Sequence, residues 1–492
     1  MKKAMIIMLT VLVLVLGGIG FAAVKIYDAH DKVTLTKMTS WGDEEYVEGL
    51  KMEINSTYDN MLFWNTKVSM DDLKSAATEY DFSITAVYPE MDRYSGLILE
   101  VSSWGLDSFL ENESVEENIT GVKQAYQELA EITEANEKKE KEIFLKDYMD
   151  YYEYDVKIDL PGTQINSLVN TIQKASVEEQ KKDAIGRMNE FFKIPVLETE
   201  RWSISLEKDD RGNIVHNGSA SKVGNFFHIR NYNALAEKEC YFTFNSHSEE
   251  GEVMDTSLIP GRYGIYCLPY DDTLEGCEED SDMFDVNAER ISVDTDGLKM
   301  VYSLDPQIDV MLLHLNGKKD KLILHAEEYG KYVVTIIDIT TMEMLQRIEV
   351  IDWNQDYKYG YQIYEEGDFI VTIVHKTKEE GRIEAVVIEE NEQGEYRIAF
   401  NCDIQNKDIP NFDTSVMYLD FDGKRLAMAG FLDEKDPYYR ESSNLFLAVC
   451  DASGMKYYGE YRNSLETGFD ADLYSYQCRG YGGEPIVLKW TE

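Results

Sequence analysis

The chain has 492 residues, of which 93 are acidic and 48 basic, so its formal net charge at pH 7 is −45. Such a charge repels DNA, RNA and anionic lipid headgroups, and it excludes nucleic-acid binding as the function. Hydrophobic residues make up 43% of the chain and aromatic residues 12%, with 33 tyrosines against 9 prolines. This composition excludes a disordered stalk and favours β-sheet, and the length predicts two or three domains.

An uncharged apolar run from Ala4 to Val24 follows Lys2 and Lys3. As a helix that rises ~1.5 Å per residue, this run is long enough to cross a ~30 Å hydrocarbon core. The two lysines favour a cytoplasmic N-terminus, so residues 1–24 are predicted to be a single-pass transmembrane helix that holds the rest of the chain extracytoplasmic at the cell membrane. The alternative is a signal segment cleaved after Ala22, which leaves a secreted protein.

Residues 25–197 are predicted to form a small membrane-proximal domain of mixed α and β structure. Short strand-like runs alternate over residues 30–110, with one expected helix at Met70–Thr78. Residues 114–148 are expected to be helical, and Ser114 with Glu117 fits a capping box at the start of the helix. An apolar stripe follows at three- and four-residue spacing: Val115, Ile119, Val122, Tyr126, Leu129 and Ile132. The stretch 135–144 is predicted to be a charged, solvated face, and residues 163–193 a second helix.

Residues 198–492 have a strand pattern throughout, with three units of four strands. The units cover Asp309–Val350, Tyr359–Ile404 and Ser415–Arg462, and glycine turns recur within them. The third strand of each unit ends at an acidic or turn position, which is Asp338, Glu389 or Asp451.

The segments Tyr332–Ile348 and Asn444–Gly454 resemble the strand pairs of β-propeller repeat proteins, in which an aspartate such as Asp338 or Asp451 begins the turn. The resemblance indicates no named family, since no WD dipeptide or kelch double glycine repeats. It implies a propeller-like domain with Ile336, Val387 and Leu447 buried on third strands; an array of β-sandwiches is the alternative. The last segment, Glu484–Glu492, is expected to close the ring against an early strand at 202–206 or 226–229.

Motifs for catalysis and nucleotide binding are absent from the sequence: it contains no GxSxG, GxxxxGK[ST], strand-linked GxGxxG or HExxH. The histidines are scattered, and His314 and His325 are interpreted as satisfied sheet residues. The acidic run from Glu275 to Asp285 is interpreted as a solvated loop, with calcium binding as the alternative. The D-x-D-G segments at 294–297 and 420–423 are interpreted as turns. No catalytic residue, cofactor or metal ligand is therefore assigned.

Six cysteines, all after residue 239, permit up to three disulfides in an exported chain. Cys267–Cys277 and Cys450–Cys478 close the shortest loops, while buried free thiols are the alternative.

The sequence thus predicts a mostly β, membrane-anchored extracytoplasmic protein that binds or senses a protein or cell-surface partner without catalysis. The alternative function is hydrolysis of cell-envelope glycans by carboxylates on the propeller face.

Overall fold

A computed structural model describes most of the chain. It describes residues 8, 10–20, 34–58, 61–83, 96–100, 120–152, 155–160, 163–166, 175–227, 231–248, 250–270, 293–353, 361–366, 369–375, 382–405, 417–432, 444–464 and 485–491. Residues 10–20 are helical, and apolar side chains such as Leu14 (69% exposed) point to solvent. Within the described part, no helix is both long and apolar enough to cross a membrane.

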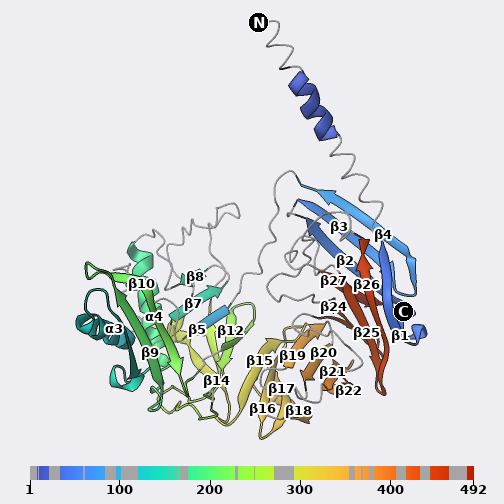
Figure 1. Ribbon diagram of the computed structural model, residues 1–492. Helices are drawn as coiled ribbons and strands as arrows, with labels where there is room; N and C mark the ends of the chain where they lie inside the picture. Colours follow the sequence, from blue (N-terminus) through green and yellow to red (C-terminus); the bar gives the residue numbers. More distant parts are fainter. Residues whose placement is uncertain are drawn as a thin grey trace. The chain divides into compact units, whose positions relative to one another are not determined.

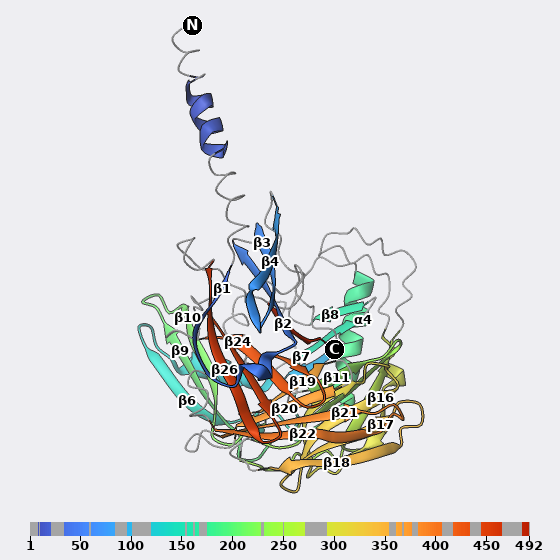
Figure 2. The same ribbon diagram turned by 90° about the vertical axis from the view of Figure 1, so that its right-hand side faces the viewer.

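The strands form antiparallel sheets that divide between two compact units (Figures 1 and 2). The terminal unit combines residues 1–93 with residues 354–492, and the central unit comprises residues 94–353. The mostly β fold with few helices agrees with the sequence-based fold class.

The described residues of the terminal unit form three sheets. The first has the order β19-β20-β21-β22, and the closing sheet has the order β27-β2-β3-β4. The middle sheet has the order β23-β24-β25-β26-β1. The strand bounds are β1 Leu35–Gly42, β2 Leu50–Tyr58, β3 Leu62–Ser69, β4 Asp72–Phe82, β19 Tyr361–Glu366, β20 Phe369–His375, β21 Arg382–Glu390, β22 Tyr396–Gln405, β23 Tyr418–Phe421, β24 Leu426–Phe431, β25 Leu445–Asp451, β26 Gly454–Asn463 and β27 Ile486–Trp490.

Apolar side chains cover both faces of the middle sheet. Along β25, Leu445 and Leu447 pack against the closing sheet, whereas Phe446 and Ala448 pack against the sheet β19–β22. This alternation is the two-residue period of a strand that is buried on both faces.

Both ends of the chain enter the terminal unit as strands. β1 adds to the outer edge of the middle sheet by pairing with β26, and β27 adds to β2 as the first strand of the closing sheet. At Gly42 the backbone has φ +93°, and an added Cβ would lie 2.0 Å from the Lys456 carbonyl oxygen. Only glycine fits this approach.

The central unit contains the sheets β5-β7-β8, β6-β9-β10, β11-β12-β13-β14 and β15-β16-β17-β18. Its elements are β5 Gly96–Glu100, α3 Thr120–Ile132, β6 Lys138–Phe144, β7 Asp155–Leu160, β8 Thr163–Asn166, α4 Ala175–Phe191, β9 Arg201–Lys208, β10 Ile214–Val223, β11 Asn231–Leu235, β12 Glu239–Phe244, β13 Gly264–Pro269, β14 Lys299–Ser303, β15 Asp309–Leu315, β16 Lys321–Glu328, β17 Lys331–Asp338 and β18 Met344–Asp352. Just after α4, the ring of Phe192 lies 5.0 Å from that of Tyr266, in a core shared with the sheet β11–β14.

The three predicted four-strand units are confirmed as β15–β18, β19–β22 and β23–β26. Ile336, Val387 and Leu447 lie on the third strand of each sheet and are fully buried, as predicted.

Other predictions were wrong. Residues 72–78, expected to be helical, belong to β4, where Thr78 pairs with Thr66 and their hydroxyl oxygens lie 3.0 Å apart. Residues 138–144, expected to continue the helix, form the strand β6; its charged side chains are exposed or half-buried, as predicted, and Ile143 is buried. Residues 163–166 are strand rather than helix. Ile132, the last residue of the apolar stripe predicted on the first helix, is 57% exposed, so this stripe is buried only in part. Ser114 lies outside the described residues.

β6 pairs with β9 and β2 pairs with β27, so these strand pairs join residues on either side of the predicted division at residues 197 and 198. The predicted partner of the last segment was wrong. Trp490 pairs with Leu50 of β2, whereas residues 201–208 form β9 within the central unit.

Candidate functional site

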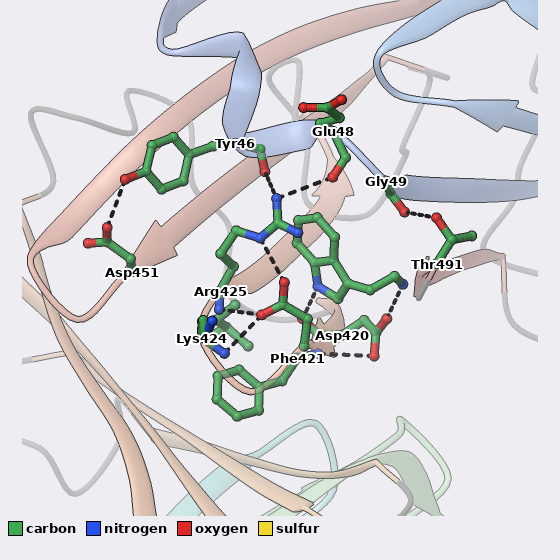
Figure 3. A network of polar contacts seen from close by, with 12 residues as sticks. Tyr46, Glu48, Gly49, Asp420, Phe421, Lys424, Arg425, Asp451 and Thr491 are labelled. Carbon is green, nitrogen blue, oxygen red and sulfur yellow. Dashed lines mark hydrogen bonds and ion pairs between the residues drawn. The ribbon is translucent and has the colours of Figure 1, made fainter.

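Three segments that are distant in sequence meet beside the closing sheet (Figure 3). They are the link between β1 and β2, which includes the short helix η1 (Glu44–Val47), the turn between β23 and β24, and the end of β27. We call this group of contacts the closure clasp.

Arg425 is the central residue of the closure clasp. Its guanidinium carbon lies 3.9 Å from the centroid of the Trp490 ring, which is cation–π geometry. One terminal nitrogen donates to the carbonyl oxygens of Tyr46 (3.1 Å) and Glu48 (3.2 Å), where η1 ends. Its Nε donates to Asp422 Oδ2 at 2.7 Å. A single side chain therefore joins all three segments, as only a planar multi-donor cation can.

Asp420 holds the last strand from the other side. Its Oδ2 accepts the backbone N–H of Trp490 at 2.6 Å, and its carbonyl oxygen accepts the indole N–H at 3.3 Å. Burial raises the pKa of the Asp420 carboxyl, and hydrogen bonds from Trp490 and Phe421 oppose this effect. Thr491 adds two bonds to the Gly49 carbonyl oxygen, from its backbone N–H (2.8 Å) and its hydroxyl (2.7 Å).

The clasp carboxylates are engaged in turn and strand contacts. Asp422 Oδ1 accepts the backbone N–H groups of Lys424 and Arg425. Asp294 likewise accepts the N–H of Gly297 at 3.1 Å. The interpretation as an Asp-Gly turn is therefore confirmed for residues 420–423, where Gly423 has φ +90°, whereas Thr295–Gly297 form the short 3-10 helix η3 with Asp294 as its N-cap. The contacts of the closure clasp hold strands together. The carboxylates named here accept hydrogen bonds from turns and strands, which is a structural role.

The aspartates that end third strands cap the turns that follow. Asp338 Oδ1 accepts the N–H groups of Thr340 (3.0 Å) and Thr341 (2.7 Å), and the Thr341 bonds lower the pKa of this carboxyl. Asp451 caps Ser453 in the same way and also accepts the hydroxyl of Tyr46 at 3.0 Å. These residues thus have structural roles.

A row of buried polar rings crosses the sheet β15–β18. His314 Nε2 lies 2.8 Å from His325 Nε2, and His325 Nδ1 lies 2.6 Å from the Tyr332 hydroxyl. His314 Nδ1 faces the Leu315 carbonyl oxygen at 3.1 Å. Because a carbonyl only accepts, we assign the His314 proton to Nδ1; His325 then donates from Nε2, and Tyr332 donates to His325.

Burial, followed by the neighbouring His314, holds the pKa of His325 well below its ordinary value. The rings of the row are hydrogen-bonded to one another, as the sequence analysis predicted for these two satisfied sheet histidines.

Ser246, His247 and Asp309 lie together, but they do not form a hydrolase triad. Ser246 Oγ (3.1 Å) and Asp309 Oδ1 (3.8 Å) both approach Nδ1 of His247, whereas a triad needs them on opposite ring nitrogens. Ser246 is fully buried, and its hydroxyl contacts the carbonyl oxygens of Pro306 and Ile308.

Among the described residues, no group of three or more His, Cys, Asp or Glu side chains is arranged to hold a metal ion. The acidic run 275–285 lies outside these residues, so the calcium alternative stays a prediction. Cys267 and Cys450, the described members of the two predicted disulfides, are buried free cysteines, as the alternative interpretation expected; Cys277 and Cys478 lie outside the described residues.

Sequence reasoning missed the closure clasp. A tryptophan near the end of the chain and an arginine after a D-x-D-G turn are its only local signals, and neither indicates the other as a partner.

No family model matches the chain, and no curated protein matches it. Similar solved structures include TolB from Acinetobacter baumannii, at 10% identity over 83% of this chain and 80% of that one, with a TM-score of 0.21. The β-propeller domain of Cps50 (Swd1) from Myceliophteria thermophila has 8% identity over 56% and 93%, with a TM-score of 0.22. The dihydro-heme d1 dehydrogenase NirN has 11% identity over 88% and 79%, with a TM-score of 0.24. β-Propeller proteins are thus among the structures that this chain distantly resembles, and no named family is indicated.

Proposed function

We propose that this protein is a membrane-anchored, extracytoplasmic binding or sensor protein without catalytic activity. Its N-terminal apolar segment crosses the cell membrane once, and its β body carries a surface for a protein or a cell-surface component.

The observation that supports this proposal best is how the N-terminal segment joins the body. β1 begins at Leu35, pairs with β26 from Leu35 to Gly42, and is fastened at its start by a 2.8 Å bond from the Thr34 N–H to Ser464 Oγ. Residues 21–34 separate this strand from the apolar helix and span at most ~50 Å when fully extended. An anchor of this kind holds one part of the body at a limited distance from the membrane.

Cleavage after Ala22 would leave β1 intact, so the secreted alternative predicts the same fold. The exposed valine and leucine side chains on the described helix favour retention, because a bilayer would cover them.

The non-catalytic part of the proposal rests on where the reactive groups lie. The histidine row is buried and its rings are hydrogen-bonded to one another, and Ser246 is fully buried. The buried glutamates also have structural partners: Glu200 accepts from the indole of Trp202 at 2.9 Å, and Glu328 accepts from Arg347 at 2.8 Å. This arrangement gives the glycan-hydrolase alternative no specific support.

The test of placement uses the full chain in its own cells. Protease added to intact spheroplasts is expected to degrade the body and leave cytoplasmic proteins whole. A variant with Lys2→Glu and Lys3→Glu is the matched control, and a smaller fraction of its chains should be degraded. Complete protection of the unaltered chain, with digestion after permeabilisation, would contradict the proposed placement.

The test of binding uses the full chain in lipid nanodiscs with a purified cell-envelope fraction. Saturable retention on the envelope without release of reducing sugar ends is expected. Absence of retention would contradict the binding role, and steady release of reducing ends would favour the glycan-hydrolase alternative.

A further inference from the structure

The row of polar rings in the sheet β15–β18 places histidines inside a core. His314 lies on β15, His325 on β16 and Tyr332 on β17, so each ring comes from a different strand. His325 and Tyr332 are fully buried, and His314 is 9% exposed. Histidine ordinarily titrates near pH ~6.5, and burial disfavours its charged form. The row therefore holds a titratable group where a charge is costly.

The three rings are stacked and joined at their edges. The ring centroids of His314 and His325 lie 5.0 Å apart at an interplanar angle of 24°, and those of His325 and Tyr332 lie 6.0 Å apart at 19°. The two Nε2 atoms of the histidines are separated by 2.8 Å, and His325 Nδ1 lies 2.6 Å from the Tyr332 hydroxyl. Both separations are hydrogen-bond distances, so each contact holds one hydrogen.

A further proton does not fit this row without the loss of a contact. With the His314 proton on Nδ1, His325 donates from Nε2 and accepts the Tyr332 hydroxyl at Nδ1. A proton added at His325 Nδ1 meets the O–H of Tyr332, and one added at His314 Nε2 meets the N–H of His325. Either position puts two hydrogens into one contact, so the core loses a hydrogen bond.

The surroundings of His325 offer no counter-ion in contact. Because side chains alternate along a strand, the charged residues on the same face of the sheet are those at positions paired with or two residues from the row, namely Asp309, Lys321, Glu327 and Asp338. On this face β18 contributes Ile348 and Ile351. Among the described residues, no carboxylate contacts the His325 ring, whose hydrogen-bond partners are His314 and Tyr332. A protonated His325 would therefore be a buried cation without a paired anion.

We propose that the row of His314, His325 and Tyr332 makes the sheet β15–β18 acid-sensitive: in mildly acidic surroundings, protonation of the row breaks one of its contacts and opens the strands β15–β17 locally. The proposal does not depend on the proposed function, because it rests on contacts within the central unit alone.

The direction of the pH dependence follows from the lowered pKa of His325. A histidine of the unfolded chain takes up a proton below pH ~6.5, whereas burial and the neighbouring His314 oppose this uptake in the closed sheet. The closed sheet therefore has its full stability above this pH and loses stability as the pH falls below it. Each pH unit below ~6.5 should raise the equilibrium constant for opening by up to about tenfold.

The experiment measures amide hydrogen exchange of the full chain in detergent between about pH 7.5 and pH 5.5, after correction for the intrinsic effect of pH on exchange. Protection of the amides of β16 and β17 is expected to fall by up to about tenfold between about pH 6.5 and pH 5.5. The strands β24 and β25, which contain no histidine, are the internal reference and should keep their protection.

Two variants show whether the row causes this response. His325→Gln should remove the loss of protection, because glutamine does not titrate and still offers a donor and an acceptor. His247→Gln changes a half-buried histidine of the same unit outside the row, so it is the matched control and should leave the response intact. If His325→Gln does not fold, the unaltered chain still provides the test, since His314 and His325 are the histidines of residues 309–352.

Three outcomes would overturn the proposal. One is unchanged protection of β16 and β17 at about pH 5.5. Another is an equal loss of protection in β24 and β25, which would indicate an effect of acid on the whole chain. The third is an undiminished response in folded His325→Gln.

Discussion

The middle sheet and the closing sheet of the terminal unit use their two faces differently. In the middle sheet every residue of β24 is buried, and apolar side chains cover both faces. In the closing sheet, Met52 and Ile54 pack on the middle sheet, whereas the opposite face of β2 and β3 carries the polar pairs Glu53–Lys67 and Asn55–Asn65 beside the buried Phe63. There Asn65 Nδ2 donates to Glu53 Oε1 at 2.5 Å and to Asn55 Oδ1 at 2.7 Å.

This difference indicates two ways of holding a strand. A strand of the middle sheet is held by apolar burial on both sides, at ~25 cal/mol per Å². The closing sheet has one apolar face, and its last strand is also held by the directed contacts of the closure clasp. Substitutions should therefore act through lost volume in the middle sheet and through lost polar contacts at the clasp.

The largest effect is expected from Leu447→Ala in β25. The side chain is fully buried against the closing sheet, so its truncation should cost ~2–4 kcal/mol of unfolding free energy. Val487→Ala in β27, where the side chain is 38% exposed, is the control and should cost far less. Unfolding in guanidinium measures the loss of unfolding free energy in both variants. Equal losses would contradict the expectation that the two sheets hold their strands differently.

The second effect is expected from Arg425→Lys at the clasp. Lysine keeps the charge but loses the planar stack on Trp490 and the multiple donors, which should cost ~1–2 kcal/mol. Arg397→Lys is the matched control, because its ion pair with Glu389 leaves the arginine side chain 66% exposed.

A double-mutant cycle of Arg425→Lys with Trp490→Leu isolates the stack. We expect a coupling of ~0.5–2 kcal/mol. A coupling near zero would show that the arginine acts through the carbonyl oxygens and Asp422 alone.

The third effect is a dependence on acid. Hydrogen bonds from Thr341 hold the pKa of Asp338 below its ordinary value in the folded protein. This carboxylate therefore stabilises the fold above its unfolded pKa, and the contribution is lost as the pH falls through the lowered folded value.

In the variant Asp338→Asn, the unfolding free energy should fall less steeply as the pH drops below about 4, the ordinary range of an aspartate pKa. Asp210→Asn, at an exposed position between β9 and β10, is the control. Unfolding measured at several pH values gives the slope of the unfolding free energy against pH. An unchanged slope in Asp338→Asn would contradict the stabilising role assigned to the Asp338 carboxylate.

The smallest effect is expected on the polar face of the closing sheet. Lys67 lies 4.0 Å from Glu53 and is 58% exposed, so Lys67→Ala should cost no more than ~0.5 kcal/mol, and less at high salt. A loss of unfolding free energy above ~1 kcal/mol would show that this face of the closing sheet is buried. The closing sheet would then resemble the middle sheet, which is buried on both faces.

The sequence predicts the four-strand units well because their signals are local. Alternating apolar residues and glycine turns define β15–β26 without reference to distant residues. The burial of Ile336, Val387 and Leu447 follows from the same pattern.

The errors arise where distant pairing overrides local preference. The segment that forms β4 contains Leu73, Ala76 and Ala77, which are strong helix formers, yet pairing with β3 makes it a strand. The partner of β27 lies more than 430 residues earlier in the chain, and no local signal indicates it. The clasp depends on that closure and was missed for the same reason.

The closure of the terminal unit also sets an order of events during synthesis. β2–β4 are complete at Phe82, but their partner β27 begins only at Ile486, about 400 residues later. At roughly 5–20 residues per second, the edge of β2 waits on the order of 20–80 s for its neighbour. During that interval an unpaired strand edge is open to pairing with other chains, so the nascent protein is most exposed to aggregation before its last residues emerge.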